Sequence, residues 1–131
     1  MNVSGKRRVV AGRRIGAIEA EVLERLWDAG RPLGVREVMA RLTGKPRAYT
    51  TVVTMLTRLV EKGLARRLPA GRAFVYEAAG SQEELAAGAI RDVLRACGDP
   101  RAVLARFVEQ MADEPELLRQ LAELVEREAG R

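Results

Sequence analysis

Four threonines and an arginine stand at helical spacing within residues 47–63, RAYTTVVTMLTRLVEKG. On a helix, one polar face would carry Thr50, Thr51, Thr54, Thr57 and Arg58, opposite an apolar stripe. Threonine is a poor helix former, and exposed helix positions more often carry Glu, Lys or Gln. Short hydroxyl side chains suit close approach to a DNA groove, where they bond phosphates or base edges and touch thymine methyl groups. By itself, the pattern is equally consistent with a DNA-binding face and with threonines that are simply tolerated on a solvated helix.

The surrounding sequence places this segment in a helix-turn-helix. The apolar stripe predicts a helix over about residues 49–62, which ends at Gly63 because glycine readily adopts the left-handed conformation of a helix stop. A shorter helix is predicted over about residues 35–42, and residues 43–46 break the chain between the two. Two short helices joined by a turn, the second with a small polar face, form the helix-turn-helix pattern.

A first helix is predicted over about residues 17–29, with Trp27 on its buried face. Three acidic residues, Glu19, Glu21 and Glu24, are expected on its exposed face. Such a face suits a helix that is not directed at nucleic acid.

After Gly63 the apolar period changes from helical to alternating. Residues 64–68 and 72–78 are predicted to form a hairpin around a turn at 69–71, which is the wing of a winged-helix domain. Its inward positions are expected to be Leu64, Leu68, Phe74 and Tyr76. Three arginines near its tip are predicted to pair with DNA phosphates: Arg66, Arg67 and Arg72.

The charge is divided unevenly along the chain. Residues 1–80 hold 16 Lys and Arg against 7 Asp and Glu, a balance of +9, whereas residues 81–131 hold 7 against 11, a balance of −4. This division suggests that the first part meets a polyanion and the second does not. The first 14 residues are basic and lack periodicity, and they are predicted to be a mobile arm. Such an arm is either a solvated tail or a contact to the minor groove or phosphates.

Composition excludes several classes of function. The chain has no histidine, no glycine-rich phosphate loop and no convincing carboxylate pair, so neither catalysis nor a metal or other cofactor is predicted. A lone Cys97 excludes an internal disulfide. No apolar run is long enough to span a bilayer, and the N-terminus does not resemble an export signal. A cytoplasmic protein is expected.

Residues 81–131 are predicted to form three capped helices. Ser81 with Glu84 forms a capping box, and Asp99-Pro100 marks the next helix start. Together the three helices hold about 45 residues, too few for a stable core of their own, so they need either an identical copy or the N-terminal part as a partner. The candidates for a dimer interface, with intrachain core as the alternative, are Leu85, Ile90, Val93, Leu94, Val103, Phe107, Leu117, Leu121 and Leu124.

These elements predict a mainly α fold with a small β-hairpin. A winged helix-turn-helix domain is expected over residues 15–80, after the arm at 1–14, and a C-terminal helical dimerisation domain over 81–131. The residues expected to contact DNA are Lys45, Arg47, Tyr49, Thr50, Thr51, Thr54, Arg58, Arg66, Arg67 and Arg72. A protein-docking module remains the alternative, because winged helices also serve that purpose.

Four groups of residues recur together in one known pattern. They are Ile18-Glu19 with Val22 and Leu26-Trp27; Val35-Arg36-Glu37-Val38; Tyr49-Thr50-Thr51-Val52 with Thr54, Leu56, Arg58-Leu59 and Lys62-Gly63; and Gly71-Arg72-Ala73-Phe74 with Tyr76. Through them, and over roughly residues 13–126, the chain resembles the penicillinase-repressor (BlaI/MecI-type) family of winged-helix transcription factors.

The resemblance implies a homodimer that represses transcription by binding a palindromic operator. It also implies a membrane-bound sensor protease as a partner, which triggers cleavage at an Asn-Phe pair in the dimerisation helices. The matching positions here are Arg106 and Phe107, so the sequence departs from the family at the cleavage site. Related copper-responsive repressors carry paired cysteines, which Cys97 alone cannot reproduce.

Overall fold

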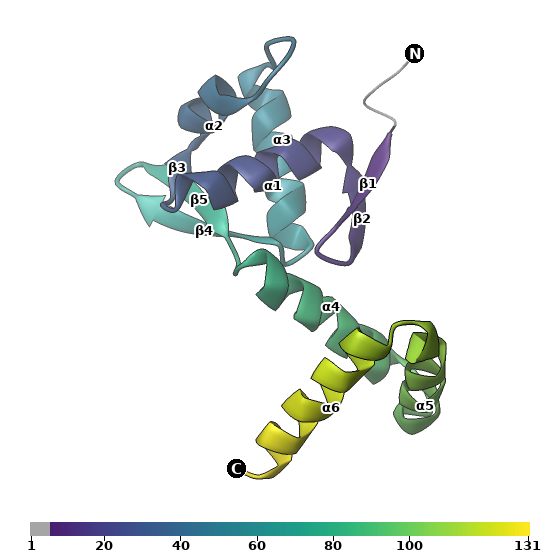
Figure 1. Cartoon of the computed structure of the whole chain (residues 1–131). Helices are drawn as coiled ribbons and strands as arrows, with labels where there is room; N and C mark the ends of the chain where they lie inside the picture. Colours follow the sequence, from purple (N-terminus) through teal and green to yellow (C-terminus); the bar gives the residue numbers. More distant parts are fainter. Residues whose placement is uncertain (1–5) are drawn as a thin grey trace. The chain divides into compact units, whose positions relative to one another are not determined.

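The computed structural model describes residues 6–131, which fall into two compact units, one ending at Ile90 and the other spanning Arg91–Arg131 (Figure 1). Three helices form the centre of the first unit: α1 (Ala17–Ala29), α2 (Val35–Arg41) and α3 (Tyr49–Glu61). Their bounds agree with the sequence prediction to within a residue. Gly63, at φ 75°, follows α3 in the left-handed conformation expected of its helix stop.

A three-stranded antiparallel sheet completes the winged helix. Its strands are β3 (Leu33–Gly34), β4 (Ala65–Ala70) and β5 (Ala73–Ala78), in the order β3-β5-β4. The turn lies at Gly71-Arg72, two residues later than predicted, because Pro69 is part of β4 and pairs with Phe74. β4 is an edge strand, where the missing N–H of proline is tolerated.

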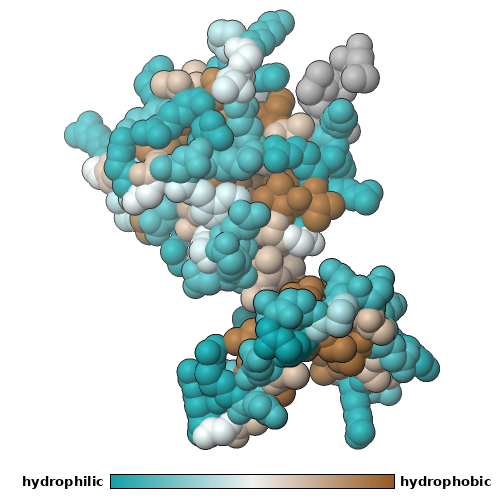
Figure 2. Space-filling model, viewed as in Figure 1, coloured by the Kyte–Doolittle hydropathy of each residue, from teal (hydrophilic) through white to brown (hydrophobic). Residues whose placement is uncertain are grey.

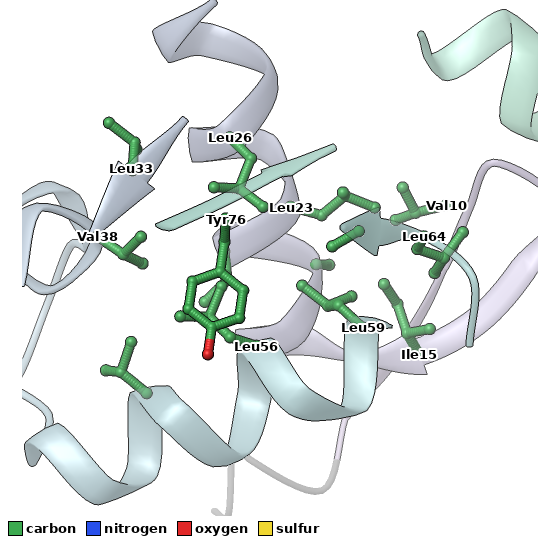
Figure 3. Packing of buried hydrophobic residues seen from close by; sticks show 14 of the residues in the cluster. Val10, Ile15, Leu23, Leu26, Leu33, Val38, Leu56, Leu59, Leu64 and Tyr76 are labelled. Carbon is green, nitrogen blue, oxygen red and sulfur yellow. The ribbon is translucent and has the colours of Figure 1, made fainter. Parts of the chain in front are cut away.

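The core of this unit lies between α1, α3 and the sheet (Figure 3). Leu23, Leu56 and Leu59 are fully buried, and Tyr76 is 4% exposed. Phe74 was expected to point inward as well, but it is 45% exposed because its end of the hairpin extends beyond the core.

The N-terminal segment corrects the expectation of a mobile arm. β1 (Arg7–Val10) and β2 (Arg13–Gly16) form an antiparallel hairpin, and residues 1–5 lie outside the described part of the chain. Ala11 and Gly12, at φ 51° and 77°, supply the two positive angles that a tight hairpin turn requires. Ile15 is fully buried in the core, which anchors the hairpin.

Three longer helices and one short 3₁₀ turn follow the wing. They are α4 (Gln82–Ala96), α5 (Pro100–Gln110), η2 (Met111–Asp113) and α6 (Pro115–Ala129). Two of the predicted caps are present, since the Ser81 hydroxyl accepts from the N–H of Glu84 at 3.0 Å and the Asp99 carboxylate accepts from Ala102 N–H at 3.1 Å. Among residues 6–131, no helix is long and apolar enough to cross a membrane.

The compact units divide within α4, although the sequence places a boundary at Ser81. Leu85 and Ala86 pack against the core of the first unit, and the indole N–H of Trp27 donates to the carbonyl oxygen of Gly80 at 2.9 Å. Ser81 therefore marks the start of a helix and not the end of the first unit.

Candidate nucleic-acid interface

The polar face of α3 lies on the surface of the first unit. Thr50, Thr54 and Thr57 are exposed, and the side chain of Arg58 is 53% exposed. Thr51 is half-buried and contributes less surface than the sequence suggested. The opposite face packs into the core, so α3 presents a row of small hydroxyl side chains that ends in a guanidinium.

Two of these threonines direct their hydroxyl protons back to the helix. Thr54 Oγ1 donates to the Thr50 carbonyl oxygen at 2.9 Å, and Thr57 Oγ1 donates to the Val53 carbonyl oxygen at 2.8 Å. These bonds explain how the helix tolerates its threonines. They leave a methyl group and an accepting oxygen for a partner, which fits a thymine methyl or a base amino group better than it fits a phosphate.

The start of α3 carries a cation–π contact that the sequence analysis missed. The guanidinium of Arg36, from α2, lies 5.2 Å from the ring centroid of Tyr49, a residue that is 46% exposed. Sequence spacing within α2 identifies Arg36 as exposed, but only the packing of α2 on α3 brings it to this surface.

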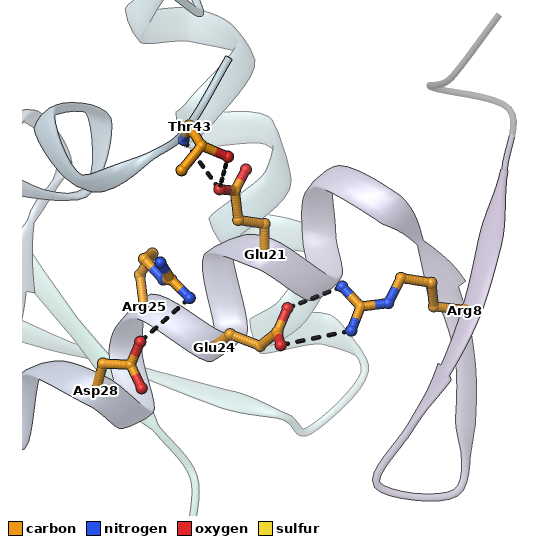
Figure 4. A network of polar contacts seen from close by, with 6 residues as sticks. All are labelled: Arg8, Glu21, Glu24, Arg25, Asp28 and Thr43. Atoms are coloured by element: carbon orange, nitrogen blue, oxygen red, sulfur yellow. Dashed lines mark hydrogen bonds and ion pairs between the residues drawn. The ribbon is translucent and has the colours of Figure 1, made fainter.

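The loop before α3 is tied to α1 through Glu21 (Figure 4). Thr43 donates to Glu21 Oε2 from its hydroxyl at 2.6 Å and from its backbone N–H at 2.9 Å. Burial works to raise the pKa of Glu21, but these hydrogen bonds and the nearby charges of Arg25 and Arg47 lower it on balance. Arg47 is half-buried, whereas Lys45 is exposed on the same loop.

The wing arginines are exposed, but two of them make contacts within the hairpin. Arg66 Nε lies 3.4 Å from a carboxylate oxygen of Glu77, and the guanidinium of Arg67 lies 4.2 Å from the ring centroid of Phe74. Arg72 is exposed at the turn itself. These contacts hold the side chains of Arg66 and Arg67 against the strands, which limits their rotamer freedom.

A groove of about 460 Å³ separates α3 from the wing. Thr57, Val60 and Glu61 line it on the α3 side, and Arg66 and Leu68 on the β4 side. Residue spacing does not predict this groove, because the groove depends on how the hairpin packs beside α3.

Glu19 corrects the predicted exposed face of α1. The side chain is buried, and its carboxylate forms ion pairs with Lys62 and Arg58 near the end of α3. Glu21 and Glu24 are half-buried, and Glu24 accepts from Arg8 of β1 at 2.8 Å (Figure 4).

The candidate dimerisation residues fall into three groups. Leu85 is half-buried against the core of the first unit. Leu94, Val103 and Leu121 are also half-buried. The remainder are 46–61% exposed, and they are Ile90, Val93, Phe107, Leu117 and Leu124. In Figure 2, brown apolar surface is visible on the C-terminal helices.

Comparison with known proteins identifies the family. The model described as penicillinase repressor matches residues 15–127, nearly the whole chain. The chain belongs to the penicillinase-repressor family. It is 38% identical over 122 residues to the transcriptional regulator BlaI of Mycobacterium tuberculosis, in strains CDC 1551 / Oshkosh and H37Rv, covering 89% of this chain and 87% of BlaI. As a member of this family, it is a DNA-binding transcriptional regulator and not an enzyme.

Solved structures similar to this penicillinase-repressor family member are more distant. Wild-type MarR from E. coli, in its apo form, has a TM-score of 0.46 and 23% identity, covering 85% of this chain and 78% of MarR. MepR, the transcription regulator of the Staphylococcus aureus multidrug efflux pump MepA, has a TM-score of 0.47 and 19% identity, covering 88% and 79%. At such scores, the winged-helix assignment rests on the chain's own helix-turn-helix and hairpin.

Proposed function

We propose that the chain is a homodimeric transcriptional repressor, which binds a palindromic operator in double-stranded DNA through α3 and the arginine-bearing wing. The observation that carries this proposal is the exposed face of α3, where three threonines and Arg58 form a surface of small side chains and one guanidinium. The division of charge along the chain supports it, because the basic part contains α3 and the wing. The protein would act in the cytoplasm, where chromosomal DNA lies.

In this proposal α3 enters the major groove. Thr50, Thr51, Thr54 and Arg58 face the base edges, with Tyr49 at the start of the helix. The phosphates are held by Lys45 and Arg47 before the helix and by the wing arginines beside it. The hydroxyl bonds of Thr54 and Thr57 favour recognition through methyl groups and accepting oxygens.

A second copy of the chain would supply the dimer. Leu117, Leu124 and Val125 of α6 and Phe107 of α5 are 46–57% exposed, and an apolar patch built from such side chains would mark an interaction site. An isologous dimer presents two α3 helices, which would meet half-sites about 34–36 Å apart or at multiples of that spacing.

Release by proteolysis in the family manner would require cleavage between Arg106 and Phe107. Both residues lie within α5, and Arg106 forms an ion pair with Glu109 at 3.0 Å. A protease needs local unfolding to reach a helical peptide bond. We therefore infer that a sensor protease would have to act on a locally opened α5, at a pair that differs from the Asn-Phe of the family.

The direct test is selection from a pool of random DNA duplexes by the full-length chain, together with a gel shift on the DNA upstream of its own gene. We expect the selection to enrich a palindromic sequence, and a duplex that carries it is called the selected duplex. The affinity of the chain for this duplex should fall steeply as ionic strength rises. A scrambled duplex of the same length and composition is the control. No enrichment, or binding insensitive to salt, would contradict DNA recognition and favour a protein-docking role.

A further inference from the structure

Glu19 places a buried carboxylate where α1 meets the end of α3. The residue is 6% exposed, and it is the one buried charged residue among residues 6–131. Glu19 Oε2 lies 2.6 Å from Lys62 Nζ, and Oε1 lies 3.8 Å from Arg58 Nη1. A buried carboxylate is costly unless it is paired, so these two cations, one in α3 and one directly after it, explain how the site is stable.

The two cations are held differently. Lys62 is within hydrogen-bond distance, and its side chain is 34% exposed. Arg58 lies beyond hydrogen-bond distance with its side chain 53% exposed, so the carboxylate attracts it but does not engage its donors. The N–H groups of Arg58 therefore remain available to an external acceptor, on the same exposed face of α3 as Thr54.

We propose that Glu19 is a positioning residue for DNA recognition, which orients Arg58 at the exposed face of α3 while Lys62 neutralises most of its charge. This inference rests on the proposed function, in which Arg58 faces a base edge. A free arginine loses considerable rotamer freedom when it binds, and a guanidinium already oriented by a fixed carboxylate loses less. Lys62 weakens the attraction between the carboxylate and Arg58. Without Lys62, Arg58 would be the remaining counter-ion of Glu19 and would be drawn inward.

A double-mutant cycle on the full-length chain tests this role. The variants are Glu19→Gln, Arg58→Ala and the pair, and the measured quantity is the ratio of affinities for the selected and scrambled duplexes. Glu19→Gln should lower this ratio by about three- to tenfold, the range expected of coupled neighbours. Affinity for the scrambled duplex should stay constant or rise, because a negative charge near the phosphates is removed. In the Arg58→Ala background, Glu19→Gln should leave the ratio unchanged.

A second variant, Lys62→Met, keeps the test decisive if Glu19→Gln fails to fold by circular dichroism. It should also lower the ratio, and again only when Arg58 is present. The positioning role would be overturned if the affinity ratio is unchanged in a folded variant, or if it falls equally with and without Arg58. Glu19 would then serve only as a structural partner of Lys62. Equal affinity of the unaltered chain for both duplexes would instead overturn the proposed function.

Discussion

The two units of the chain bury their apolar side chains to different extents. In the first unit, Ile15, Leu23 and Leu56 are fully buried, and they belong to a continuous core. In residues 91–131, Met111 is the buried hydrophobic residue, whereas Phe107 and Leu124 are nearly half-exposed. The first unit therefore has the core of an independently folded domain, and the second has helices whose apolar faces still lack a partner surface.

This difference assigns separate tasks to the two units. The first can hold α3 and the wing rigidly because their inner faces are packed. In the proposed dimer, the exposed apolar side chains of the second would pack against another copy of the chain. Substitutions in each unit can test that division.

Leu23→Ala should destabilise the first unit by about 2–5 kcal/mol, because it leaves a cavity in a packed core. The matched change Leu117→Ala, at a side chain that is 48% exposed, should cost much less in a dilute sample where chains are monomeric. Denaturant unfolding measures both. Similar losses at the two positions would show that the units do not differ as described.

Leu124→Glu should break the proposed dimer by placing a charge on its apolar face. Affinity for the selected duplex should then fall by about 100-fold, because the two half-sites are no longer bound as one linked unit. The control is Gln120→Glu, at an exposed position of the same helix. Sedimentation of each variant reports its oligomeric state, and a dimeric Leu124→Glu variant would place the interface elsewhere.

Arg58→Ala should weaken binding to the selected duplex by about 1–3 kcal/mol if Arg58 reads a base. The oligomeric state should not change, because Arg58 belongs to the first unit. A gel shift on both duplexes measures the effect. An equal loss on the scrambled duplex would make Arg58 a phosphate contact.

Thr54→Val and Thr54→Ser separate the two groups that Thr54 can offer to DNA. If its methyl contacts thymine, the serine variant should lose about 0.8 kcal/mol of affinity, the value of one buried methyl group. The valine variant should bind nearly as well as threonine, since the hydroxyl proton is already bonded to Thr50. Titration of the selected duplex compares them, and the reverse order would identify the hydroxyl as the reading group.

Glu84 provides the smallest effect, at the start of α4. The backbone N–H of Ser81 donates to its carboxylate at 2.9 Å and lowers the pKa of Glu84 below its usual value. Its contribution to stability is therefore present above the unfolded pKa and is lost as pH falls through the lower folded pKa. Thermal unfolding should show Glu84→Gln less stable than the unaltered chain at neutral pH, with the difference vanishing in acid. A constant difference would contradict this cause.

Local signals in the sequence predicted much of the fold. The bounds of α1 and α3 follow from apolar periodicity, and Gly63 and the Ser81–Glu84 pair mark a helix end and a helix start through their own chemistry. The winged-helix fold and the family were confirmed. These features depend on residues within a few positions of each other, which sequence spacing can resolve.

Features that depend on tertiary packing were missed. Ile15 anchors residues 7–16 as a hairpin only because the core offers it a place. Glu19 was expected to be exposed, because the two cations that pair with its carboxylate are about 40 residues away in the sequence and only the fold brings them together. Arg36 likewise reaches the surface around α3 through helix packing. The DNA contacts and the dimer interface stay predictions.

We expect two copies of the chain, joined by their C-terminal helices, to read DNA through paired α3 helices. Footprinting on the selected duplex, with the stoichiometry of the complex measured by sedimentation, tests it most directly. Two chains on each duplex are expected, with two symmetric protected half-sites spaced by about 34–36 Å or a multiple of it. One chain protecting a single asymmetric site would contradict it.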